Sequence, residues 1–163
     1  MMQAKVRVTM SRALAAAGLL ALSGGPASAG DAASAREVVP AAERAGIDLE
    51  ATGGPAQTRG VSATNVLGGL DLEPDFPALK GYRMRARVVT LDAGGVIAVH
   101  QHDSRPAVAY LLAGEVTEMR GAEQAVTYKA GEAAFEQSGL VHWWENRSDA
   151  PATVLVVDIV PKD

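Results

Sequence analysis

Three histidines stand among the 163 residues of the chain, and all of them lie within residues 94–146. His100 and His102 are two apart in the β-prone run VIAVHQH, so on a strand their side chains point to the same face. His142 follows a Ser-Gly turn signal and opens a second β-prone run, HWW. If the two strands are neighbours, three imidazoles converge, and neutral imidazole is a good ligand for iron, zinc, nickel and copper. The spacing therefore predicts a site for a divalent transition metal (Fe, Zn, Mn, Ni or Cu).

Glycines flank these histidines at a spacing that resembles the two sequence motifs of the cupin superfamily. The first motif is carried by Gly94, His100, His102 and Gly114, and the second by Gly131, Gly139, His142 and Asn146. The resemblance is to a small single-domain cupin and covers roughly residues 62–160. It implies an all-β fold, the double-stranded β-helix or jelly roll with two antiparallel sheets. One fold hosts many chemistries, so the resemblance is informative about the fold and much less about the activity.

Two positions depart from the pattern of the family. The glutamate that binds metal in the first motif falls on Ala107, and the proline of the second motif falls on Gln137. Because an alanine methyl offers no donor, the expected site is a neutral set of three histidines with water or substrate in the open positions. Three protein ligands with an open position suit metal catalysis, and they are also what partial loss of a site would leave.

Four further residues are candidates for catalysis or ligand binding. Glu136 and Gln137 precede the turn to His142; they are either solvent-facing loop residues or, inside the pocket, a general base and a hydrogen-bonding group for a substrate. Arg105 follows the first two histidines near the expected rim of the pocket, where an arginine can hold a carboxylate in a bidentate pair. Trp144 is in step with His142 and is either an aromatic wall for a small organic ligand or part of the core.

Short β-prone runs bounded by Gly, Pro and Asp are typical of an antiparallel sandwich or barrel. We expect strands at residues 64–67, 83–91, 96–102, 108–112, 115–119, 125–129, 133–136, 141–146 and 153–159. On these strands, alternation places Val96 and Ala98 beside His100. It also puts Arg83, Arg85 and Arg87 on one face, which we interpret as solvated; the alternative is a subunit interface or a pocket mouth that attracts an anion.

The acidic, proline-containing segment 71–77 is predicted to be an irregular arm. In the cupin family such a segment often crosses to a partner subunit. The resemblance, together with the exposed edges of a β-sandwich, therefore predicts a homodimer.

The N-terminus has the features of a secretory signal peptide. Lys5, Arg7 and Arg12 accompany the short apolar core 13–22, and the A-x-A sequence that ends at Ala29 is a cleavage site. We expect residues 1–29 to be removed and the protein to be periplasmic or secreted, with a retained anchor as the alternative. Residues 30–60 are interpreted as a flexible lead-in and 61–163 as one cupin domain.

Composition excludes several classes of function. The chain has no cysteine, which excludes disulfides and a thiol mechanism. Its formal net charge is −4, and cleavage of the signal would remove only basic residues, so the remainder is more acidic still. An acidic domain is a poor candidate for binding nucleic acid or an anionic membrane.

Three classes of function remain. The first is a metal-dependent enzyme, an oxygenase or a Lewis-acid catalyst, that acts on a small organic molecule. The second is a non-catalytic module that binds a metal or a small ligand. The third is a degenerate cupin without metal, which the alanine at 107 permits.

Overall fold

The computed structural model describes residues 38–121 and 123–162, so the predicted signal peptide lies outside the described residues. The described chain is mostly strand: β1 (Arg59–Asp71), β2 (Tyr82–Gln101), β3 (Ala107–Ala113), β4 (Glu115–Arg120), β5 (Gln124–Lys129), β6 (Ala133–Glu136), β7 (Val141–Glu145) and β8 (Ala152–Pro161). The helices described are short: η1 (Ala41–Arg44), α2 (Leu49–Thr52) and η2 (Pro77–Leu79). None of them has the length and apolar character that crossing a membrane requires.

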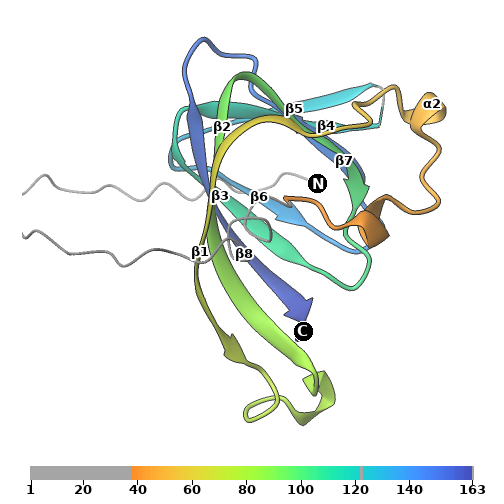
Figure 1. The fold of residues 1–163 in the computed structure, drawn as a ribbon, viewed down its shortest axis with the longest axis vertical. Coiled ribbons are helices and arrows are strands. Elements are labelled where there is room, and N and C mark those ends of the chain that lie inside the picture. The colour runs from red at the N-terminus through yellow and green to blue at the C-terminus, as the bar shows by residue number, and fades with distance from the viewer. Residues whose placement is uncertain (1–37, 122, 163) are drawn as a thin grey trace, which may run out of the picture.

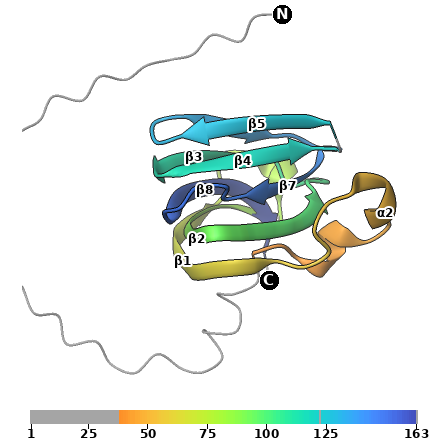
Figure 2. The same cartoon turned by 90° about the horizontal axis from the view of Figure 1, so that it is seen from above.

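The strands wrap into a barrel-like jelly roll in which the observed strand pairs are antiparallel (Figures 1 and 2). They are hydrogen-bonded in the order β5-β4-β7-β2-β8-β3-β6, and β1 pairs with β2. The first part of β2 pairs with β1 and β8, and its last part pairs with β7, so this strand links the two layers. The predicted fold class is confirmed.

Strand β2 joins the two strands that were expected at residues 83–91 and 96–102. The expected turn between them is a sharp bend within one strand. Gly94 takes a φ of 69°, and a Cβ on Gly95 would lie 2.8 Å from the carbonyl oxygen of Gly60. The side-chain amide of Asn146 fastens the bend by donating to the carbonyl oxygen of Leu91, at 3.0 Å. Asn146 is therefore a structural residue.

The segment 71–77 connects β1 to β2 at the tip of a long hairpin that extends away from the barrel (Figure 1). Leu72 is buried, and its backbone N–H donates to the carbonyl oxygen of Tyr82. The segment is irregular, as predicted, and within this chain it closes the hairpin.

Two of the three arginines on β2 face the interior. Arg87 is 5% exposed, and Arg85 donates two hydrogen bonds to Asp158, its partner on β8. The prediction of a solvated arginine face is therefore wrong for these two residues. It failed because the partner carboxylate comes from a strand 73 residues later in the chain, which alternation alone does not reveal.

The core lies between the two layers, with a second cluster where the N-terminal residues meet the barrel. The main cluster contains Leu91, Ala109, Leu111, Val116, Ala134, Trp144 and Ala152. The second joins Val38 and Val39 to Val89 of β2. Val38 and Val39 belong to the range 30–60 interpreted as a flexible lead-in, and here they are buried against the barrel.

Candidate metal centre

The three histidines meet inside the barrel, as their spacing predicts. His100 on β2 is paired with His142 on β7, and His102 follows the end of β2. All three side chains are buried. The Nε2 atom of His100 lies 3.1 Å from the Nε2 atom of His102 and 3.1 Å from that of His142. The three rings therefore present one nitrogen each to a common point.

The opposite nitrogen of each ring is held by an oxygen. The Nδ1 atom of His100 contacts the carbonyl oxygen of Ala98, and that of His102 contacts the carbonyl oxygen of Arg105, both at 2.9 Å. Nδ1 of His142 lies 2.7 Å from Oε1 of Glu118. A carbonyl or carboxylate oxygen only accepts, so each Nδ1 carries the proton and donates it. The three Nε2 lone pairs then face one another.

A metal ion fits this arrangement of lone pairs. Acceptor nitrogens that face one another this closely repel unless a positive charge lies between them. Two nitrogens on one ion, with bonds of about 2.1 Å, are about 3.0 Å apart when the bonds meet at a right angle and about 3.4 Å apart at the tetrahedral angle. The observed separations of 3.1 Å lie between these values. His100, His102 and His142 would hold the ion with little movement.

Burial keeps His100 and His102 in the neutral form that ligation requires. Desolvation, followed by the charge of the neighbouring imidazoles, lowers the pKa of His100 well below its ordinary value of 6.5. Desolvation and the adjacent Arg105 lower the pKa of His102 to about 3. In the folded protein both rings therefore stay available to a metal in mildly acidic solution.

We expect the metal-free protein to lose stability as the pH falls from 6.5 toward 3. In this window the unfolded chain takes up protons on His100 and His102, while the folded state does not. The free energy of unfolding should fall by about 1.4 kcal/mol per pH unit for each fully buried neutral histidine. Burial also raises the pKa of Glu136 above its ordinary value of 4.5, so above pH 4.5 acidification stabilises the folded state through this residue. This gain comes from one group, whereas the loss comes from two histidines. Urea denaturation at pH 7, 6 and 5 measures the slope, and stability that rises on acidification would contradict it.

Glu118 is a residue of the centre that the sequence reasoning missed. It is fully buried on β4, and its carboxylate accepts from Nδ1 of His142 and from the guanidinium of Arg120, both at 2.7 Å. Burial alone would raise its pKa, but these two hydrogen bonds lower it. Such a carboxylate fixes the orientation and tautomer of a ligating histidine. Its position in step with the apolar Val116 was the available signal that it faces inward.

Glu136 lies beside the centre and is buried, so the interpretation as a solvent-facing loop residue is wrong for it. Its Oε2 atom is 3.4 Å from Nε2 of His102, and its Oε1 atom accepts from the indole N–H of Trp144 at 3.1 Å. Glu136 on β6 pairs directly with Ala107 on β3. Paired residues of neighbouring strands share a face. A carboxylate therefore stands one strand away from the position where the cupin motif places its glutamate.

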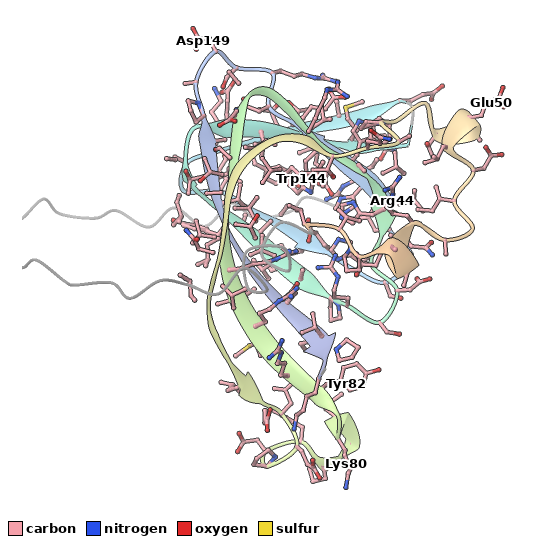
Figure 3. All side chains as sticks on the ribbon, viewed as in Figure 1. Arg44, Glu50, Lys80, Tyr82, Trp144 and Asp149 are labelled. Atoms are coloured by element: carbon pink, nitrogen blue, oxygen red, sulfur yellow. The ribbon has the colours of Figure 1, made fainter. Side chains whose placement is uncertain are left out.

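A cavity adjoins the histidines, and Glu136 is among the residues that line it. Gln137 is exposed and lies outside this cavity, so the structure does not bring it to the histidines. Trp144 lies inside the barrel, where it belongs to the core and also lines the cavity next to the histidines (Figure 3). Val89, Ile97 and Val156 extend the apolar wall.

Ile97 lines the cavity in place of Val96 and Ala98, which alternation had placed there. The pairing of β2 with β7 shifts register between Ile97 and His100, so these two residues face the same side although they are three apart. At this shift, β2 donates two hydrogen bonds to the segment just before β1. One of them runs from the N–H of Val99 to the carbonyl oxygen of Pro55 at 3.0 Å.

Arg105 lies in the wall of the cavity and is buried, whereas the sequence placed it at the rim. Its Nη1 atom donates to Asp158 at 2.8 Å, and its Nε and Nη2 atoms donate to the two carboxylate oxygens of Glu43. Arg105 therefore does engage a carboxylate through two adjacent N–H groups, and that carboxylate comes from the chain itself.

Comparison with known proteins gives a family match and a set of similar structures. The family model described as a cupin domain matches residues 87–158. No curated protein matches the chain. Among solved structures, a Thermus thermophilus protein is 28% identical with a TM-score of 0.49 and covers 67% of this chain and 88% of its own. The Cnp3 cupin domain of Schizosaccharomyces pombe is 14% identical with a TM-score of 0.50 and covers 72% and 74%.

A Thermotoga maritima protein described as a predicted oxalate decarboxylase is 20% identical with a TM-score of 0.43, covering 63% of this chain and 97% of its own. At 14% identity, the likeness to the Cnp3 domain concerns the fold alone. The domain match spans both histidine motifs and strands β3 to β7, and the strands form the jelly roll that the motifs imply. Residues 87–158 therefore match the cupin domain, within a chain that folds as a jelly roll.

Proposed function

We propose that the protein binds one divalent transition metal through His100, His102 and His142 and receives a small organic ligand in the adjoining cavity. The convergence of three Nε2 atoms, each on a ring anchored at Nδ1, carries this proposal. Preorganised neutral imidazoles bind a divalent ion without first rearranging. Metal analysis of the purified protein tests the proposal: about one equivalent per chain supports it, and a metal-free protein that takes up no added metal rejects it.

A bound metal would supply Lewis-acid or redox chemistry at the positions that the three histidines leave open. Beside it, Glu136 can hold or transfer a proton, because burial raises the pKa of its carboxyl group and its Oε2 atom lies 3.4 Å from Nε2 of His102. Trp144 orients Glu136 through its indole N–H and keeps water from that side of the cavity. These two residues favour the enzyme class.

A non-catalytic module that binds a metal or small ligand is the alternative, since the same histidines serve storage or sensing equally well. The Glu136→Gln variant separates the two classes. It keeps the volume and the hydrogen bond to Trp144 but cannot transfer a proton. In an enzyme, turnover of a substrate found by screening should fall about 100-fold or more while metal content persists. A binding module would show no turnover in either form.

We propose that the protein is a homodimer that associates through β1. Val66, Leu67 and Leu70 on this strand are 57%, 63% and 48% exposed. In the described part of the chain β1 has a strand partner on one side alone, β2. An exposed apolar edge of this kind is a site of association. Light scattering at micromolar concentration should give the dimer mass, and Leu67→Lys should shift it toward the monomer; a monomeric wild-type protein would contradict the proposal.

We propose that the chain is exported and that the mature protein begins at Gly30. The A-x-A sequence behind a short apolar core supports this. The intact mass of the exported protein provides the measurement, and a mass that retains residues 1–29 would reject cleavage at Ala29.

A further inference from the structure

The segment 38–44 covers the cavity beside the metal centre, and Figure 1 shows its beginning in orange. Val38 and Val39 are buried and line the cavity. The carbonyl oxygen of Val38 accepts from the guanidinium of Arg87 at 3.1 Å. With this segment in place the cavity measures about 40 Å³, enough for a few water molecules and too small for an organic ligand. An organic ligand therefore needs more room than the segment leaves beside the histidines.

Glu43 on η1 fastens this segment to the wall of the cavity. Its two carboxylate oxygens accept from Nε and Nη2 of Arg105. This is the bidentate arrangement by which arginine recognises a free carboxylate. Both side chains are buried, 5% exposed for Arg105 and 10% for Glu43, so the pair is shielded from water.

The charges around Arg105 determine what can replace Glu43. The buried carboxylate of Asp158 is shared among Arg85, Arg87 and Arg105. Without Glu43 these three cations would keep Asp158 as their one direct ion-pair partner among the described residues. Leaving a buried charge unpaired is strongly unfavourable. Glu43 is therefore displaced readily only by another anion that fits the same edge of Arg105.

We propose that Glu43 stands in for the carboxylate of the ligand. A small carboxylic acid with an apolar body would bind the Nε and Nη2 edge of Arg105 when the segment 38–44 withdraws. Its apolar part would contact Val89, Ile97 and Trp144, which line the same cavity as Val38 and Val39. The inference rests on the cavity being the ligand site of the proposed function, but it does not require the metal.

The first test compares Glu43→Gln with wild type in the full chain, after removal of metal. Butyrate and benzoate are the probes, and butyramide and benzamide are their neutral counterparts. Glu43→Gln weakens the internal competitor, so calorimetric titration should show roughly tenfold tighter binding of the acids and no gain for the amides. Glu50→Gln is the matched control, since Glu50 is exposed on helix α2, which follows this segment in the chain (Figure 3). It should behave as wild type.

A second variant keeps the test decisive if Glu43→Gln does not fold. Val39→Ala weakens the packing of the segment and leaves the ion pair intact, so it should tighten acid binding roughly fivefold. Acids that bind both variants no more tightly than wild type, or amides that gain equally, would overturn the proposal. Adding Arg105→Gln to Val39→Ala should remove the gain, and a gain that persists would also overturn it.

Repeating the titrations on zinc-loaded protein separates this inference from the proposed function. A protein that binds the acids as expected but takes up no zinc supports the site at Arg105 and rejects the metal centre. A protein that binds zinc, but whose variants gain nothing for the acids, rejects the site at Arg105 and leaves the metal centre standing.

Discussion

Replacing His142 with alanine is expected to lower the affinity for Zn²⁺ by about a hundredfold or more. Loss of an outer carboxylate around a metal site typically costs 10–100-fold in affinity, and loss of one of three ligands should cost at least as much. His100→Ala should have an equally large effect, since its Nε2 atom contacts those of both other histidines. Competition against a chromophoric chelator at neutral pH measures the affinity.

Two variants on β4 accompany this experiment. Glu118→Gln should lower the affinity by about 10–100-fold, because it removes the charge that orients His142. Glu115→Gln makes the same change on the same strand, but at the surface, where Glu115 lies 3.3 Å from Lys129. It should leave the affinity unchanged. If folded His142→Ala binds zinc as tightly as wild type, the three histidines do not share one ion.

Asp158→Asn is expected to lower the free energy of unfolding by about 3–5 kcal/mol. The carboxylate of Asp158 is fully buried and accepts from Arg85 at 3.0 and 2.8 Å and from Arg105 at 2.8 Å. Burial alone would raise its pKa, but the hydrogen bonds and charges of the arginines lower it, so it is ionised at neutral pH. Asparagine keeps the volume but leaves buried guanidinium groups without their shared counter-ion.

Urea denaturation of the metal-free protein at pH 7 measures this loss. Asp149→Asn is the matched control, because Asp149 lies in the exposed loop before β8 (Figure 3). It should change the stability by less than about 0.5 kcal/mol. A loss below about 1 kcal/mol for Asp158→Asn would mean that the arginines are paired or solvated without it.

The jelly roll and the three histidines could be predicted from the sequence because both depend on local spacing. Residues two apart on a strand share a face, and the glycines mark the turns and bends that bring His142 beside His100. The side chains that complete the site depend on distant partners. Glu118 meets His142 across 24 residues, and Glu43 meets Arg105 across 62. No periodicity in the sequence connects such positions.

Two errors share a physical cause. Alternation placed Val96 and Ala98 in the cavity, but a register shift in β2 turned Ile97 inward instead. Of the two interpretations of Glu136, the solvent-facing one was wrong, because its carboxylate accepts from the indole N–H of Trp144 in the interior. In both cases the tertiary contacts of one strand decided which face a residue takes.

X-ray absorption at the metal edge of the zinc-loaded protein tests the central claim most directly, because it reports the atoms bound to the ion. The structure predicts three imidazole nitrogens at about 2.0–2.1 Å, with oxygen completing the coordination sphere. A coordination sphere of oxygens without imidazole scattering, in a protein that holds one zinc per chain, would contradict a metal centre at His100, His102 and His142.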